Sequence, residues 1–238
     1  MPELKDLRIK IFADGADREG MVRLAADPHI KGFTTNPTLM NAAGIRDMEG
    51  FAREILEAIP DKPISFEVFA DEFDEMERQA LKITTWGPNV YVKIPVTNTR
   101  GVSASSLTSR LCEQGVKLNL TALMTPVQVA EVAEALAGGP PAIVSVFAGR
   151  IADSGVDPIP LMRESLEILK PHAGIELLWA SPREVLNIVQ ADQLGCHIIT
   201  VTHDLLKKLS NLGKDLTEFS LDTVKMFFND GQAAGFAI

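Results

Sequence analysis

The sequence predicts a single-domain (β/α)8 TIM barrel. Short apolar or β-branched runs recur along the 238 residues, most of them precede a stretch with helical spacing, and no long linker interrupts the pattern. The runs begin roughly 22–33 residues apart, which is the length of one strand–helix unit. Eight such units in one chain favour a closed barrel. The predicted strands are residues 8–13, 32–35, 64–70, 90–96, 117–123, 142–148, 175–180 and 197–202.

Helical spacing follows several of these strands, at 71–84, 125–137 and 160–169. The Gly-Gly-Pro-Pro cluster at 138–141 predicts a turn. A last helical stretch, 216–228, lies in a C-terminal helix and tail from about 214 to 238, which either closes the barrel or contacts a neighbouring copy. An open doubly wound sheet is the alternative fold, but neither Gly-x-Gly-x-x-Gly nor Gly-x₄-Gly-Lys-Ser/Thr is present to favour it.

Charge and composition limit the function. A net charge of −9 disfavours a general role on nucleic acid or on an anionic membrane surface. No leader pattern and no membrane-length apolar run is found, so we expect a cytoplasmic protein with no membrane partner. The two cysteines, Cys112 and Cys196, and the four scattered histidines lack the spacing of a metal site, so no metal is expected.

Polar side chains occur on nearly every predicted strand. Alternation places residues two apart on one face, so Lys93 shares its face with Tyr91 and Pro95. In a barrel the inward faces meet, and catalytic groups gather at the carboxyl ends of the strands. Seven of the eight strands thus direct a polar group toward one volume. These groups, with Lys93, are Asp14, Asn36, Glu67, Asn119, Thr121, Ser145 and Ser181.

Each of these groups also has a structural explanation. Asp14 and Asn36 could cap helices, and Thr121 and Ser145 could be core hydroxyls with satisfied hydrogen bonds. Seven separate structural explanations, one for each strand, are a less probable account of these residues than a single shared site. We therefore expect one active site at the carboxyl ends of the strands.

Lys93 indicates the chemistry of that site. A buried ammonium group is costly unless it is paired or neutralised, so one interpretation is a structural ion pair with Glu67. The other is that apolar surroundings yield a neutral amine that attacks a ketone. The resulting iminium draws electrons from an adjacent carbon–carbon bond, which breaks and leaves an enamine. Asp14 and Glu67 would serve as the base for the hydroxyl proton and as the group that moves protons to and from water, without any cofactor.

Two segments near the later strands predict an anion site. Gly149-Arg150 follows the sixth predicted strand, and Ser181-Pro182-Arg183-Glu184 follows the seventh. Phosphate sites of such barrels often lie near strands seven and eight and a helix N-terminus. The second segment is also a good capping box with proline at the first helical position, and a helix that begins there could still receive an anion.

These residues, in this order, resemble the transaldolase family, which are class I aldolase-like barrels. The resemblance runs from residue 14 to about residue 206. The matching segments are Phe-Ala-Asp at 12–14, Thr-Thr-Asn-Pro at 34–37, Glu67, Val-Lys-Ile-Pro at 92–95, Asn-Leu-Thr at 119–121, Ser-x-Phe-x-Gly-Arg at 145–150 and Ala-Ser-x-Arg at 180–183.

The resemblance implies roles for these residues. Lys93 would form the Schiff base, Asp14 would be the acid/base at the sugar C4 hydroxyl, and Glu67 with Thr121 would position the catalytic water. The reaction would transfer dihydroxyacetone from fructose 6-phosphate or sedoheptulose 7-phosphate to an aldose phosphate, in the non-oxidative pentose phosphate pathway. The remaining implied contacts are Asn36, Asn119 and Ser145 to the dihydroxyacetone unit, and Arg150, Ser181 and Arg183 to the phosphate.

Fructose 6-phosphate aldolases are the related alternative. They typically carry glutamine in place of Glu67 and tyrosine in place of Phe147, and a phenol can donate a proton that favours release of the enamine. The combination in this chain is the transaldolase one. Pro182, Thr38 and the segment Ile-Ala-Asp-Ser-Gly after Arg150 depart from the usual pattern, and leave open whether the head group is a phosphate or a sulfonate.

A third hypothesis is a barrel that has lost catalysis and acts as a scaffold. It predicts loss of the lysine or its carboxylates, and the sequence retains them all. By analogy with short family members, which are often assemblies of ten subunits, we expect a homo-oligomer whose partners are phosphorylated sugars.

Overall fold

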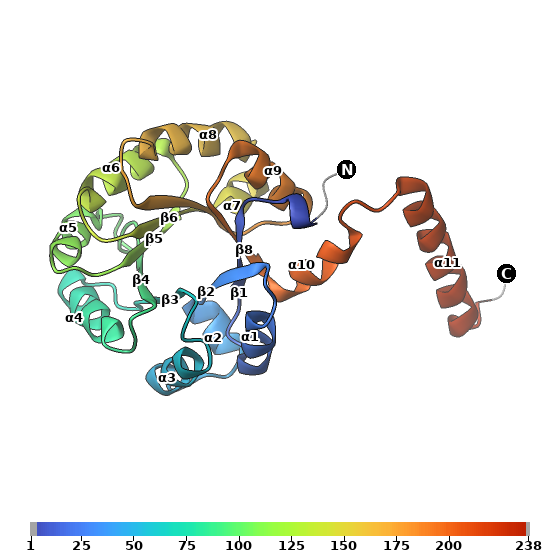
Figure 1. The fold of residues 1–238 in the computed structure, drawn as a ribbon, viewed down its shortest axis with the longest axis horizontal. Helices are drawn as coiled ribbons and strands as arrows, with labels where there is room; N and C mark the ends of the chain where they lie inside the picture. Colours follow the sequence, from blue (N-terminus) through green and yellow to red (C-terminus); the bar gives the residue numbers. More distant parts are fainter. Residues whose placement is uncertain (1–3, 237–238) are drawn as a thin grey trace.

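The computed structural model describes residues 4–236 and shows a closed barrel of eight parallel strands in chain order, β1 to β8 (Figure 1). A closed barrel excludes the alternative of an open doubly wound sheet. All eight predicted strands are present, with ends within three residues of the predicted ones. The strands are β1 (Lys10–Asp14), β2 (Ile30–Thr34), β3 (Ile64–Glu67), β4 (Val90–Pro95), β5 (Leu118–Leu123), β6 (Ala142–Val146), β7 (Ile175–Trp179) and β8 (Ile198–Thr202).

Helices surround the barrel and cover its outer face (Figure 1). The α-helices are α1 (Arg18–Ala25), α2 (Pro37–Ala42), α3 (Met48–Ala58), α4 (Phe73–Thr84), α5 (Ser105–Glu113), α6 (Pro126–Leu136), α7 (Ala148–Asp153), α8 (Pro158–Leu169), α9 (Leu186–Leu194), α10 (His203–Lys207) and α11 (Leu216–Ala234). Two 3₁₀ helices, η1 (Leu4–Asp6) and η2 (Lys208–Asn211), complete the described chain.

Local sequence accounts for the helix starts. Asp17 caps α1 by accepting a hydrogen bond from the Gly20 amide, and Thr125 forms a capping box with Gln128 at the start of α6. Asp14 therefore caps no helix, whereas Asn36 caps α2, with Pro37 at its first position. The structural explanation is thus wrong for Asp14 and correct for Asn36.

Two apolar cores follow from strand alternation. The larger one lies between the outer barrel face and the helices and includes Val92 and Ile94 of β4. Four of the five residues of the smaller one, including Ile143 before Ser145 and Ile198 before Thr200, precede cavity residues by two positions, so it lies inside the barrel. The Phe12 ring of this core packs against Gly32 on the neighbouring strand, where a Cβ would lie 2.6 Å from the ring. This core closes the barrel beneath the cavity.

The C-terminal helix departs from the compact barrel. Helix α11 begins at Leu216 as predicted but continues to Ala234, has no buried residue, and stands away from the barrel (Figure 1). Within residues 4–236, no helix combines the length and the apolar character needed to cross a membrane.

Candidate active site

A cavity of about 430 Å³ opens at the carboxyl ends of the strands, where the polar strand residues were predicted to meet. Nine of the eleven predicted site residues line it, while Asn119 and Arg183 do not. The nine are Asp14, Asn36, Glu67, Lys93, Thr121, Ser145, Phe147, Arg150 and Ser181.

Lys93 is the lysine among the charged side chains that line this cavity. It lies on β4 with 6% of its surface exposed, and its Nζ atom is 3.1 Å from Oε2 of Glu67. The same nitrogen donates a hydrogen bond to the Thr35 carbonyl oxygen at 3.3 Å. Glu67 reaches Lys93 because β3 and β4 pair in register at these two residues. The ammonium group therefore has both charge compensation and an accepting carbonyl, as a buried charge requires.

Asp14 reaches the same cavity from β1, which β2 separates from the strands β3 and β4 that carry the Lys93–Glu67 pair. Its Oδ1 atom accepts a hydrogen bond from Thr34 Oγ1 at 2.7 Å. Burial raises the pKa of Asp14, although the Lys93 charge and the Thr34 hydroxyl act against the increase. A carboxyl group with an elevated pKa in a cleft suits a proton-transfer role.

Thr121 presents an unsatisfied hydroxyl. Its side chain is 1% exposed, and Oγ1 has no hydrogen-bond partner among the described residues. An irregularity in the β5–β6 pairing after Leu120, with Ala122 at a φ of 66°, places both Thr121 and Ala122 on the cavity wall. A buried hydroxyl of this kind calls for a partner, and a water or substrate oxygen in the cavity would supply one.

A hydrogen-bonded row of polar side chains crosses the barrel beneath the cavity. Ser145 Oγ donates to Asn119 Oδ1 at 2.7 Å, and Asn119 Nδ2 donates to Ser65 Oγ at 3.0 Å. Asn119 is fully buried and does not line the cavity, whereas Ser145 does. Asn119 therefore orients the Ser145 hydroxyl in this structure.

The predicted anion end has one arginine at the cavity. Arg150 lines the cavity, and its guanidinium lies 5.8 Å from the centre of the Phe147 ring. Arg183 is 46% exposed at its side chain and forms a two-point ion pair with Asp153 through Nε and Nη2. In this structure Arg183 is thus occupied by a carboxylate outside the cavity.

The Ser181 segment differs from the predicted capping box. Helix α9 begins at Leu186, and Ser181 has a φ of 61° without capping a helix. Its carbonyl oxygen approaches Gly149 so closely that a Cβ on the glycine would lie 1.5 Å away. The prediction of a helix at Ser181 is therefore wrong, because the chain first packs its backbone against Gly149.

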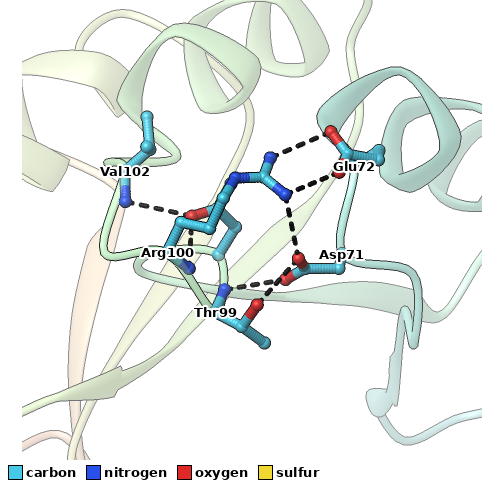
Figure 2. Close-up of polar contacts among 6 residues, drawn as sticks. Asp71, Glu72, Thr99, Arg100 and Val102 are labelled. Atoms are coloured by element: carbon cyan, nitrogen blue, oxygen red, sulfur yellow. Dashed lines mark hydrogen bonds and ion pairs between the residues drawn. The ribbon is translucent and has the colours of Figure 1, made fainter.

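The loops after β3 and β4, which follow Glu67 and Lys93, are bound to each other (Figure 2). Asp71 accepts hydrogen bonds from the Thr99 amide at 2.7 Å and from the Thr99 hydroxyl at 2.8 Å. Arg100 adds two contacts to Glu72, at 2.7 and 2.9 Å. These contacts join the two loops on the solvent-exposed side, while the strands themselves are held in register by their own pairing.

Several cavity residues were not predicted from the sequence. The strand threonines Thr34 and Thr200 are buried polar residues, and they could have been found by applying the alternation rule to β2 and β8. The other lining residues are apolar, or are neighbours in sequence of residues that were predicted. Thr38, which the sequence placed near the head group, lines the cavity; the unpredicted lining residues are Thr34, Pro37, Leu39, Ala122, Leu178, Ala180 and Thr200.

Comparison with known proteins decides the family. The family model described as "Transaldolase/Fructose-6-phosphate aldolase" matches residues 11–238. This chain belongs to the transaldolase/fructose-6-phosphate aldolase family. Among its relatives, a "Probable transaldolase" of Dehalococcoides mccartyi is 34% identical over 84% of this chain and 90% of its own length. A "Probable transaldolase" of Symbiobacterium thermophilum is 34% identical over 95% of this chain and 98% of its own length.

Solved structures support the fold of this family member. A dihydrodipicolinate synthase from Rhodopseudomonas palustris superposes with a TM-score of 0.62 at 13% identity, covering 97% of this chain and 81% of that one. At this identity the likeness concerns the barrel alone. The chain is thus a (β/α)8 barrel and belongs to a family of class I aldolase-type enzymes. Membership of this family implies sugar phosphate substrates.

Proposed function

We propose that the protein is a transaldolase that transfers a dihydroxyacetone unit from a ketose phosphate to an aldose phosphate through a Schiff base on Lys93. The observation that carries this proposal is the Lys93 amine, which is buried at the cavity and lies 3.1 Å from Glu67. A scaffold would not need an ammonium group at that cost in desolvation.

The reaction uses this chain's residues in sequence. Lys93 Nζ adds to the C2 carbonyl of the ketose and water leaves, which gives the iminium. The Asp14 carboxylate takes the C4 hydroxyl proton, the C3–C4 bond breaks, and its electrons form the enamine while the aldose phosphate departs. The enamine carbon then attacks the acceptor aldehyde, Asp14 returns the proton to the new hydroxyl, and water releases the product ketose from Lys93.

Glu67 and Phe147 favour transfer over simple release. Glu67 contacts the Lys93 nitrogen, where a carboxylate can move protons to and from the water that forms and hydrolyses the Schiff base. Phe147 lines the cavity with a ring that has no proton to donate. Without a phenol at this position to protonate it, the enamine survives long enough to meet an acceptor aldehyde.

Release of glyceraldehyde 3-phosphate from fructose 6-phosphate, with and without erythrose 4-phosphate, tests this proposal. Release that depends on erythrose 4-phosphate supports a transaldolase. Equal release without the acceptor would mean a fructose 6-phosphate aldolase and would overturn the roles of Glu67 and Phe147.

A sulfonated ketose is the second candidate donor. The observation that favours it is the single arginine, Arg150, among the described residues that line the cavity, since Arg183 is paired with Asp153. A sulfonate carries one negative charge, and one guanidinium can balance it. A higher kcat/KM for 6-deoxy-6-sulfofructose than for fructose 6-phosphate would support this donor, and the reverse order would exclude it.

We also propose that the protein acts as a homo-oligomer through α11. This helix has no buried residue, and a large exposed apolar surface is typical of a subunit interface. Light scattering on the full chain should give a multiple of the monomer mass, which Phe227→Asp with Phe228→Asp should lower; a monomeric wild type would contradict the proposal. The exposed apolar residues are Leu216, Phe219, Leu221, Val224, Met226, Phe227 and Phe228.

A further inference from the structure

The eighth strand also brings a polar side chain to the cavity. Thr200 of β8 lines the cavity with 6% of its surface exposed, two residues after Ile198 of the inner core. Strand β1 lies between β8 and β2 in the barrel and pairs with each of them. On β8, Thr200 pairs with Phe12 of β1, and on β2, Thr34 pairs with Asp14 of β1. This arrangement brings the hydroxyls of Thr200 and Thr34 into direct hydrogen-bond contact.

The direction of this hydrogen bond follows from counting protons. An ionised Asp14 carboxylate can only accept, so the Thr34 hydroxyl, 2.7 Å from Oδ1, must donate its one hydrogen to it. Thr34 then has only lone pairs to offer to Thr200. The Thr200 hydroxyl is therefore the donor, and the order of the chain is Thr200 to Thr34 to Asp14.

We propose that Thr200 is a positioning residue that acts on Asp14 through Thr34. Its donation polarises the Thr34 hydroxyl, which strengthens the bond from Thr34 to Asp14 Oδ1 and holds that carboxylate with its other oxygen available for the substrate. The inference rests on the proposed function, in which ionised Asp14 accepts the C4 hydroxyl proton. Thr200 itself exchanges no proton with the substrate.

The charges around Asp14 determine how this effect is read in a pH profile. Lys93 of β4, which is paired with Glu67 of β3, and His203 of α10 both favour the ionised form of Asp14, and burial opposes it. Burial also lowers the pKa of His203, against the charge of Asp17. Loss of the Thr200 donor weakens one of the groups that stabilise the carboxylate, so Asp14 should ionise at a higher pH.

Thr200→Val tests the inference because valine keeps the shape and removes the donor. We expect kcat for transfer from fructose 6-phosphate to erythrose 4-phosphate to fall about five- to tenfold, the loss of one typical hydrogen bond. KM for the donor should stay near the wild-type value, and the acid limb of the kcat profile should move to higher pH. Thr200→Ser retains the hydroxyl and should restore both quantities.

Thr108→Val is the matched control for loss of a buried threonine hydroxyl. Thr108 is fully buried on α5, and its hydroxyl donates to the Ala104 carbonyl at 2.9 Å, away from the cavity. This variant should lose stability with an unchanged pH profile. His203→Gln should keep the shift caused by Thr200→Val, because the shift originates at Asp14.

The outcomes separate this inference from the proposed function. If the wild type turns over and Thr200→Val keeps the same kcat and the same acid limb, the role of Thr200 is overturned and the proposed function is not. Failure of Thr200→Ser to restore the profile would assign the effect to packing and would also overturn it. Absence of turnover and of borohydride trapping in the wild type would overturn the proposed function and this inference with it.

Discussion

Lys93 and Glu67 lie side by side on adjacent strands in register, with Nζ and Oε2 3.1 Å apart and both side chains mostly buried. Removing one partner of such a pair leaves an uncompensated charge in a poorly solvated place. The pair therefore serves two purposes: it keeps the lysine in the cavity, and it places a carboxylate at the nitrogen that would become the imine.

Glu67→Gln keeps the size and the acceptor oxygen of Glu67 but removes its charge. Because the amide cannot move protons, transfer to erythrose 4-phosphate should fall about 10²-fold or more, while the share of acceptor-independent release rises. The measurement is glyceraldehyde 3-phosphate release with and without acceptor. Glu72→Gln, which alters an exposed carboxylate bound to Arg100, should leave this ratio unchanged. An unaltered ratio in Glu67→Gln would remove Glu67 from the chemistry.

Thr121→Val separates a catalytic hydroxyl from a structural one. Oγ1 of Thr121 has no partner among the described residues, so valine should leave the thermal midpoint unchanged or raise it slightly. Transfer should nevertheless slow by about tenfold or more, because the water of Schiff-base hydrolysis loses a partner. Calorimetry and steady-state kinetics on the same preparation check both parts. A destabilised variant with normal kcat would identify Thr121 as a structural residue.

Asp14→Asn should stabilise the fold while it abolishes turnover. Burial raises the pKa of Asp14 above its ordinary value of 3.8, so folding favours the protonated form and the ionised form lowers stability. The wild type therefore loses stability as the pH rises through the elevated pKa, and asparagine avoids that loss. The stability that asparagine adds should be greatest above the elevated pKa of Asp14 and should disappear toward pH 3.8. It should amount to about 1.4 kcal/mol for each pH unit by which the pKa in the folded protein exceeds that in the unfolded chain.

Thermal unfolding of both proteins across this pH range provides the measurement. Each kcal/mol should appear as about 2–4 °C in Tm for a chain of this size. A variant that is less stable than the wild type at neutral pH would show that the ionised Asp14 is stabilising, which is the opposite of the expected sign.

Arg150→Ala and Arg183→Ala should have unequal effects on the donor. Arg150 lines the cavity, whereas Arg183 is half exposed and bound to Asp153. We expect KM for fructose 6-phosphate to rise about tenfold or more in Arg150→Ala, since a charge-assisted contact is lost, and only a few-fold in Arg183→Ala. Initial rates over a range of donor concentrations give the comparison. An equal or larger effect in Arg183→Ala would mean that substrate draws Arg183 away from Asp153.

The sequence was sufficient to predict the barrel, because strand-length apolar runs at the spacing of strand–helix units leave little choice of topology. It also predicted most of the cavity, since polar residues in apolar strands are unusual. Thr34 and Thr200 were missed because threonine is an ordinary strand residue, and only the register with β1 shows that their hydroxyls meet.

The remaining differences arise from contacts between distant segments. Ser181 has the local signature of a helix start, but the close approach of its carbonyl to Gly149 delays the helix to Leu186. Arg183 follows a plausible phosphate motif, but an ion pair with Asp153, thirty residues earlier in the chain, takes its guanidinium. Neither contact leaves a periodic pattern that a single sequence could reveal.

Borohydride reduction in the presence of fructose 6-phosphate tests the central claim most directly. We predict a mass gain equal to a reduced dihydroxyacetone adduct on the peptide that contains Lys93, and no adduct in Lys93→Arg, which keeps the charge but not the nucleophile. An adduct on a different lysine, or turnover in Lys93→Arg, would contradict the assignment of Lys93 as the Schiff-base residue.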